Sequence, residues 1–162
     1  MLTQMIIRNF ALIEQMNISF KDGITIFTGE TGAGKSILMD AFSILLGERA
    51  SSEFIRHGKD SFVIDGIFDI ANHQSLLDLL QSKNILVEDN QLILSRSFNT
   101  SGKSIILAND QPIPLKALKE IGLLLADLHG QYSNQKLLNP DSHHEYLDGY
   151  NQAGSKAYKE YK

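Results

Sequence analysis

An eight-residue glycine-rich motif constrains this chain more than any other feature of its sequence. It is a complete Walker A pattern made of Gly29, Glu30, Thr31, Gly32, Ala33, Gly34, Lys35 and Ser36. A strand-like apolar run at 24–27 precedes the motif, and apolar residues recur at helical spacing after it, from 37 to 46. A strand, a phosphate loop and a helix in this order predict an α/β fold of the P-loop NTPase class.

The residue types of the motif suit a nucleoside triphosphate. Glycines let backbone N–H groups approach phosphate oxygens closely, and the following helix directs its positive N-terminal dipole at them. Lys35 is expected to reach the β and γ phosphates, and the Ser36 hydroxyl is expected to hold Mg²⁺. A chance match in a glycine-rich loop would not explain the strand-like and helix-like flanks. We therefore expect ATP and Mg²⁺ as ligands.

Hydrophobic patterning before residue 82 predicts several further elements. Two short strands are expected at 5–10 and 18–20, and a buried strand at 24–27. A helix ended by Gly47 is expected at 37–46, followed by a strand at 62–70 and a second helix at 74–81. The last two elements suggest a second βα unit.

In the remainder of the chain, apolar runs at 92–94 and 105–107 flank a polar stretch, which is typical of a β-hairpin. Pro114 is well placed to start a helix through Leu125 that ends near Gly130. The segment 141–162 loses large aliphatic residues and gains tyrosine and lysine, which predicts a helix leaving the globule. The tail of the Walker pattern also recurs at 101–104, but in the hairpin, where Lys103 is expected to be simply solvated.

Composition limits the function classes that remain open. The 162 residues, of which 43% are hydrophobic, suffice for one domain with a core. Cysteine is absent, so disulfides, thiolate zinc sites and cysteine nucleophiles are excluded. No apolar run approaches the roughly 18 residues of a membrane span, so a cytoplasmic protein without membrane contact is expected. The net charge of −4 excludes a uniformly basic body, and any DNA contact must be local.

The sequence lacks a clear acidic partner for the phosphate loop. Hydrolysis also requires a carboxylate that completes the Mg²⁺ shell and a group that positions water. Asp65 and Asp127 follow apolar runs, but neither precedes a glutamate. Two alternatives therefore stay open from the residues alone. One is a complete small P-loop kinase or NTPase that uses Asp65 or Asp127 for the metal, and the other is a non-catalytic interaction module.

Five segments together resemble the RecN family of bacterial DNA-repair ATPases, which is similar to the SMC (structural maintenance of chromosomes) proteins. They are Ile7 to Ile13, Thr28 to Ser36, Leu46 to Ala50, Ile55 to Gly58 and His129-Gly130-Gln131. The heads of this family are of the ABC type and are split by a long coiled coil. The resemblance covers only the first half of such a head.

The resemblance implies a domain organisation and further site residues. Residues 1–140 would form the N-terminal lobe of the head, with a mixed β-sheet, a β-hairpin and flanking helices, and 141–162 would lead toward the coiled-coil arm. Gln131 would be the Q-loop residue near Mg²⁺ and the lytic water. Arg56 would approach the nucleotide phosphates, with Arg49 as a competitor for that role.

It also implies partners. The Walker B strand, the catalytic glutamate and the signature motif would all belong to a C-terminal half of the same head. ATP would be sandwiched between two heads in a homodimer, and DNA would be the longer target in a nucleoid-associated protein. Alone, this part is expected to be a poor ATPase.

Overall fold

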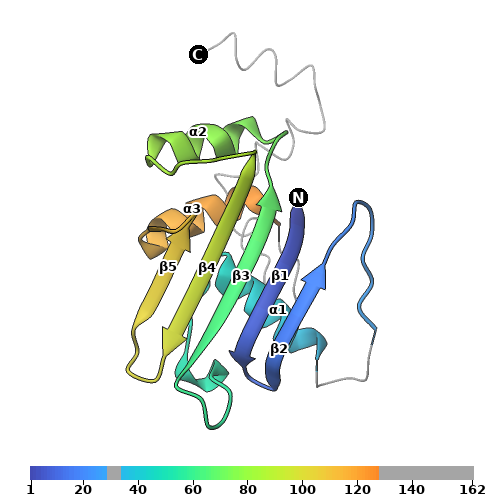
Figure 1. Cartoon of the computed structure of the whole chain (residues 1–162), viewed down its shortest axis with the longest axis vertical. Coiled ribbons are helices and arrows are strands. Elements are labelled where there is room, and N and C mark those ends of the chain that lie inside the picture. The colour runs from blue at the N-terminus through green and yellow to red at the C-terminus, as the bar shows by residue number, and fades with distance from the viewer. Residues whose placement is uncertain (29–33, 128–162) are drawn as a thin grey trace, which may run out of the picture. The chain divides into compact units, whose positions relative to one another are not determined.

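One antiparallel sheet organises the part of the chain that the computed structural model describes, residues 1–28 and 34–127 (Figure 1). The strands are β1 (Leu2–Phe10), β2 (Ile13–Ser19), β3 (Ser61–Asp69), β4 (Gln91–Asn99), β5 (Ser104–Ala108) and β6 (Gln111–Pro112). The helices are α1 (Lys35–Leu45), the short 3₁₀ turn η1 (Ser52–Phe54), α2 (Gln74–Ser82) and α3 (Leu115–Leu125). The predicted helix at 141–162 lies outside the described residues.

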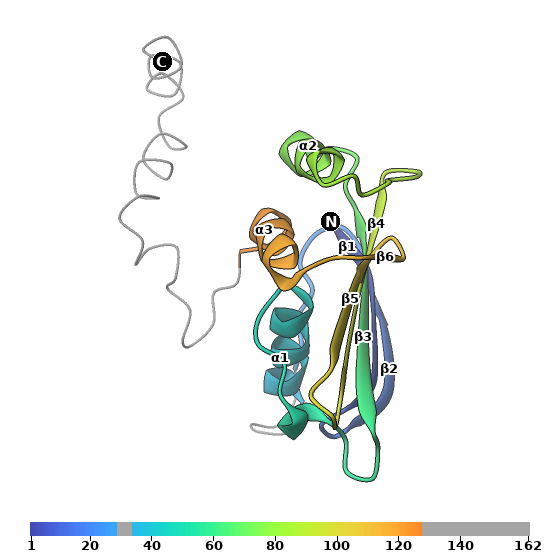
Figure 2. The same ribbon diagram turned by 90° about the vertical axis from the view of Figure 1, so that its left-hand side faces the viewer.

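The strand order is β2-β1-β3-β4-β5-β6, and every pair among the described strands is antiparallel. Because side chains alternate along a strand, one face of the sheet is apolar and the other is largely polar. Figure 2 shows α1 and α3 packed on a single face. The core lies between these helices and the sheet. The strands contribute to it the inward-pointing side chains of Met5, Ile7, Phe62, Ile64, Phe68, Leu92 and Leu94.

Most of the predicted elements are confirmed, some with shifted ends. The strands at 5–10 and 62–70, both helices flanking 47–73, the hairpin around 99–103 and the helix after Pro114 are all present. The second strand begins five residues earlier than expected, at Ile13. As predicted, Gly47 follows the end of α1, with a left-handed φ of +116° that suits glycine after a helix.

Two predictions are wrong. Residues 24–27 form no strand and are exposed, because no described strand lies beside them to accept or donate ladder hydrogen bonds. The second βα unit is also absent. The helix α2 joins β3 to β4, but these strands are antiparallel neighbours, whereas a βαβ unit joins parallel strands. The parallel part of the expected mixed sheet is therefore not found among the described strands.

The C-terminal end of α1 is tightly packed against β3 and α3. A β-carbon at Gly66 of β3 would lie 2.5 Å from Cδ2 of Leu45, and one at Gly122 of α3 would lie 2.2 Å from the carbonyl oxygen of Leu46. Because the neighbour of Gly122 is backbone, only glycine allows α3 to approach the end of α1 this closely. The neighbour of Gly66 is the end of a leucine side chain. The sheet and α3 thus hold α1 from two sides.

We predict that Gly122→Ala destabilises the protein by about 1–3 kcal/mol, because overpacking against the Leu46 carbonyl outweighs the gain of about 1 kcal/mol in helix propensity. Leu123→Ala, at an exposed position of the same helix, should change stability by less than about 0.5 kcal/mol. Urea denaturation measures both variants. A more stable Gly122→Ala protein would contradict the close packing of α3 against the Leu46 carbonyl.

An ion pair links α2 to α3. The ammonium of Lys83, just after α2, bonds the carboxylate of Glu120 in α3. The hydrogen bond from Lys83 is the main reason that the pKa of Glu120 lies below its usual value, with the nearby charges of Lys83 and Lys116 acting in the same direction. Since the Glu120 side chain is partly exposed, the interaction is screened by solvent and salt.

We expect the stabilisation from Glu120 to depend on pH. A carboxylate with a lowered folded-state pKa stabilises the protein above its unfolded-state pKa, and the effect is lost as pH falls through the folded value. The difference in melting temperature between the native protein and Glu120→Gln should therefore be largest near neutral pH. It should shrink as pH falls below about 4.3, the usual glutamate pKa, and vanish below the lowered folded-state pKa. Thermal melts at several pH values measure it, and 0.5 M salt should reduce it. A pH-independent difference would contradict this assignment.

Candidate nucleotide site

The described part of the glycine-rich motif forms the start of α1. Gly34 is the N-cap residue, and Lys35 and Ser36 open the helix at exposed positions. Within the described ranges no side chain caps the helix, and no acidic residue occupies its first turn. The first backbone N–H groups of a helix have no intrahelical partners, so this uncapped end offers donors and a positive dipole to an anion. Residues 29–33 lie outside the described residues.

Gly34 itself is not required by the packing of the described residues. A β-carbon at this position would meet nothing within 4 Å, and its φ of −137° is accessible to other residues. A glycine at such a place is explained by close approach of something that is not part of the described fold. A phosphate group against the backbone is one such ligand.

Arg56 is held by the turn between β1 and β2. Its backbone N–H donates to the carbonyl oxygen of Asn9 at 2.9 Å, and its Nη1 donates to that of Leu12 at 2.6 Å. Its Nη2 lies 4.0 Å from a carboxylate oxygen of Glu14. Both views place this turn, η1 and the start of α1 toward the same end of the sheet (Figures 1 and 2). Arg56 therefore shares the motif's end of the molecule, whereas Arg49 is exposed after α1.

Aromatic packing fixes the backbone beneath Arg56. The rings of Phe10 and Phe54 stack with centroids 5.1 Å apart, and Phe10 meets Phe62 edge to face at 5.0 Å. The N–H of Ala11 also donates to the carbonyl oxygen of Phe54 at 2.7 Å. The turn and η1 are thus one packed unit that carries the arginine.

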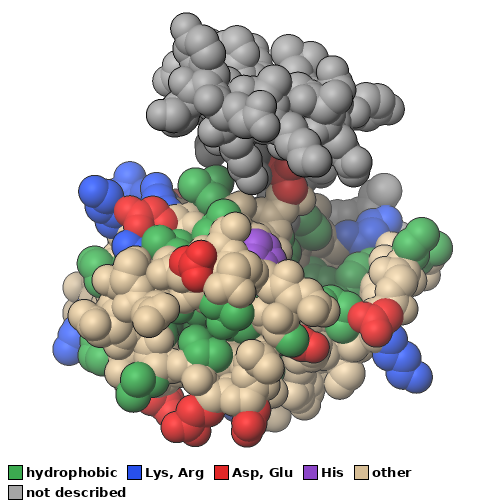
Figure 3. Space-filling view, turned by 90° about the horizontal axis from the view of Figure 1, so that it is seen from above, with side chains coloured by type: hydrophobic (Ala, Val, Ile, Leu, Met, Phe, Trp, Pro, Cys, Tyr) green, Lys and Arg blue, Asp and Glu red, His purple; other side chains and the backbone are tan. Residues whose placement is uncertain are grey.

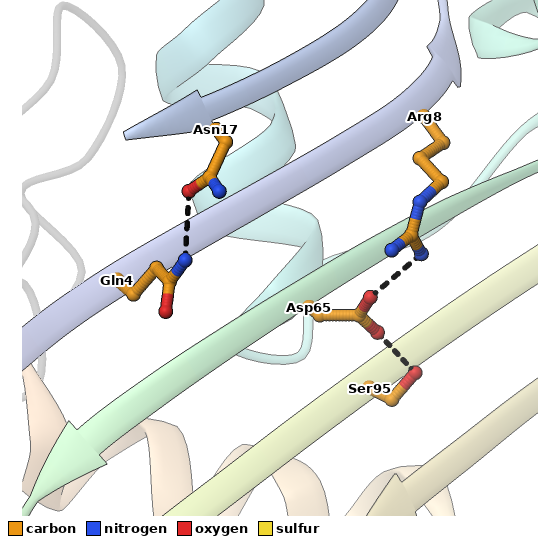
Figure 4. Close-up of polar contacts among 5 residues, drawn as sticks. All are labelled: Gln4, Arg8, Asn17, Asp65 and Ser95. Atoms are coloured by element: carbon orange, nitrogen blue, oxygen red, sulfur yellow. Dashed lines mark hydrogen bonds and ion pairs between the residues drawn. The ribbon is translucent and has the colours of Figure 1, made fainter. Parts of the chain in front are cut away.

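Neither Asp65 nor Asp127, the two candidate metal ligands, lies at the end of a strand beside the start of α1. Asp65 points away from α1, because its neighbours Ile64 and Gly66 occupy the helix-facing side of β3. Its carboxylate accepts hydrogen bonds from Arg8 at 3.1 Å and Ser95 at 2.6 Å on the outer face (Figure 4). Asp127 is exposed just after α3 and follows a helix instead of a strand.

Gln131, the proposed Q-loop residue, lies outside the described residues. The described residues therefore bring together Gly34, Lys35 and Ser36, with Arg56 at the same end of the sheet. They leave Asp65 on the opposite face. In the described ranges, no three histidine or acidic side chains gather as a metal cluster.

The segment before the motif is unusually apolar and exposed. Ile24 and Ile26 are 93% and 78% exposed, and Phe27 is also largely open to solvent. Among the aromatic rings of the described residues, Phe27 meets the edge of Phe20, at 6.3 Å between ring centroids. Ile37 and Leu38, in the first turn of α1, are only partly covered. The chain on both sides of the motif thus carries apolar surface that the described fold does not bury.

Sequence reasoning missed one buried residue next to α1. Arg96 of β4 is only 2% exposed, and its Nη1 donates to the carbonyl oxygen of Ile44 at 2.9 Å. Burial lowers its pKa from the usual value, while the charge of Glu48 acts in the opposite direction. The signal was present in the sequence, because Arg96 shares the alternation phase of the inward-pointing Leu92 and Leu94.

The end of the sheet opposite the β1–β2 turn carries charges of both signs (Figure 3). Seen from above, acidic and basic side chains are dispersed among uncharged ones, and the visible described surface shows no continuous basic patch (Figure 3). Among the described helices, none is long and apolar enough to cross a membrane.

Comparison with known proteins agrees with the fold. Residues 4–153 match the AAA domain family. The DNA repair protein RecN of Bacillus subtilis is 43% identical over 148 residues, which are 91% of this chain and 26% of that protein. The chain thus spans about a quarter of the length of the curated relatives it matches.

Solved structures share the fold. An Smc head domain with a coiled coil and joint, from Pyrococcus yayanosii, superposes with a TM-score of 0.66 over 98% of this chain and 35% of that one, at 16% identity. A chain from a study of ATP-driven dimerization and DNA-stimulated activation of SMC ATPases gives 0.64, also at 16% identity, over 91% and 97% of the two chains.

The confirmed fold class is therefore a P-loop ATPase head of the SMC type, seen here as an antiparallel sheet with flanking helices. On the family match and the RecN similarity together, this chain belongs to the AAA domain family and is a RecN-like head region.

Proposed function

We propose that this chain is the ATP-binding N-terminal part of a RecN-like SMC-family ATPase that acts in DNA double-strand-break repair and recombination. Mg-ATP is held at the start of α1 by residues 29–36. Lys35 contacts the β and γ phosphates, and Ser36 binds Mg²⁺ through its hydroxyl. When bound, the metal supplies charge neutralisation for the triphosphate.

One observation supports this proposal most strongly. Among the described residues, no side chain caps the helix that follows the motif, and its first turn has no acidic residue. Its N-cap residue is Gly34, which has no side-chain acceptor, whereas Ser, Thr, Asp or Asn at this position would satisfy one of the first N–H groups. An uncapped start fits a helix whose first N–H groups are satisfied by a bound anion.

Two further residues complete the proposed nucleotide contacts. Gln131 is assigned to Mg²⁺ and the lytic water, because an amide both donates and accepts without adding charge. Arg56 is assigned to the phosphates, since its planar guanidinium suits bidentate contact. Its present bonds to the β1–β2 turn mean that this contact would require its side chain to leave Leu12.

Hydrolysis is proposed to require a C-terminal half of the same head and a second head. The exposed run at 24–27 supports the first requirement, because an exposed segment of β-branched and aromatic residues is suited to pairing within a larger sheet. The second follows the ATP-driven dimerization studied for the SMC neighbour. DNA is the proposed target of the full protein, and the proposed location is the cytoplasm, with the nucleoid.

We expect Lys35→Ala to weaken binding of a fluorescent ATP analogue, with Mg²⁺, at least tenfold, since a charge-assisted bond contributes about 1.5–3 kcal/mol. Lys103→Ala is the matched control, because it removes a lysine from the same four-residue pattern in the β4–β5 hairpin. The control should bind within about twofold of the native chain. Equal binding by all three proteins would favour the non-catalytic module.

We also expect Ile26→Asp to separate folding from assembly. Ile26 is so exposed that the change should alter the stability of residues 1–162 by less than about 0.5 kcal/mol. ATP turnover should appear when the native chain is mixed with a separately expressed C-terminal half, and Ile26→Asp should abolish it. Leu86→Asp, at another exposed apolar position, should leave it intact.

Turnover by the isolated native chain at the rate of the mixture would contradict the split head. It would instead favour a complete small P-loop enzyme. Asp65 could not supply its metal ligand without leaving Arg8 and Ser95 on the other face of the sheet.

A further inference from the structure

Arg96 reaches the last turn of the P-loop helix from beneath. It lies on β4 between Ile64 of β3 and Ile106 of β5, which are its cross-strand partners on the helix-facing side. Its Nη1 donates to the Ile44 carbonyl at 2.9 Å, and its Nε finds no hydrogen-bond partner among the described residues. A charged side chain is thus buried in an otherwise apolar layer.

Stability alone does not account for this arginine. Burying a guanidinium with an unpartnered N–H costs free energy, and replacing buried charges with apolar residues of similar volume is often neutral or stabilising. The Ile44 carbonyl would not be orphaned, since the Gly47 N–H also donates to it at 3.1 Å. The last turn of α1 has no basic residue of its own, so Arg96 supplies the positive charge that complements the helix dipole.

The anchor has geometric consequences for the other end of α1. The helix has eleven residues and is therefore about 16 Å long. Gly66, Arg96 and Gly122 fix its C-terminal end, whereas its first turn, with Lys35, is exposed. A tilt of about 4° at the anchor displaces Lys35 by about 1 Å, and a misplacement of this size can cost about 10²-fold in rate.

We propose that Arg96 is a positioning residue of the nucleotide site. It orients α1 on the sheet, and through α1 it sets the places of Lys35 and Ser36 relative to the phosphates. The proposal deepens the ATP-binding function proposed above and rests on it. Arg96, a buried residue far from the glycine-rich motif in the sequence, thereby takes part in nucleotide binding.

The test compares three variants of residues 1–162. Arg96→Met keeps most of the volume and removes the charge and the bond, whereas Arg96→Lys restores the charge. Leu76→Ala removes a fully buried side chain in α2, with an expected cost of about 2–5 kcal/mol, without touching α1. It is the control for a loss of stability as such.

Two readouts are taken well below the melting temperatures. With a fluorescent ATP analogue and Mg²⁺, Arg96→Met should bind about tenfold more weakly, Arg96→Lys should recover part of the loss, and Leu76→Ala should bind within about twofold of native. Without nucleotide, hydrogen exchange of amides 38–41 should accelerate in Arg96→Met and not in Leu76→Ala.

The proposal would be overturned if amides 38–41 of Arg96→Met exchanged at the native rate. Unchanged affinity of this variant for the ATP analogue would overturn it as well. Equal loss of affinity in Leu76→Ala would also overturn it, because stability would then explain the effect. If the native chain binds no nucleotide, the proposed function fails, and the role of Arg96 in nucleotide binding fails with it. The exchange data then still report whether Arg96 orients the helix.

Discussion

The attachment of α1 at one end only is the constraint on which the described architecture depends. Its last turn is enclosed by the sheet and α3, and the close approach of Gly122 to the Leu46 backbone leaves no room for a side chain. Its first turn is exposed, and no side chain of the described residues caps it. A helix held in this way has a fixed C-terminal end and an exposed N-terminal end. A phosphate-binding site needs both, because its donors must be held in place and still be open to the ligand.

Patterning in the sequence predicted most of the described fold because the information is local. Periodicity locates α1, α2 and α3, and alternation locates β1, β3 and the β4–β5 hairpin. The failure at 24–27 has a physical cause. A strand exists only through its neighbour, so an apolar run becomes one only where another strand offers hydrogen bonds. Pairing direction was likewise beyond local patterning, which is why α2 suggested a βα unit.

The site was predicted in part for a similar reason. The Walker pattern identifies Lys35 and Ser36 by itself, whereas the position of Arg56 depends on a long-range bridge between Phe10 and Ile55. Asp65 could have been assigned to the outer face by alternation, since Ile64 and Gly66 take the inner phase. Arg96 could have been assigned inward in the same way. A charged residue in an apolar phase is easily passed over unless each strand position is assigned to a face.

The exposed run at 24–27 has a consequence for biosynthesis. In a protein of the relatives' length that begins with this region, about three quarters of the chain would still be untranslated when the region emerges, which takes on the order of tens of seconds at about 5–20 residues per second. During that interval a short β-prone segment stands open to aggregation. Lys21 and Asp22 lie just before it, separated from it by Gly23, and are exposed, so they are placed as gatekeeper charges that discourage premature association between nascent chains.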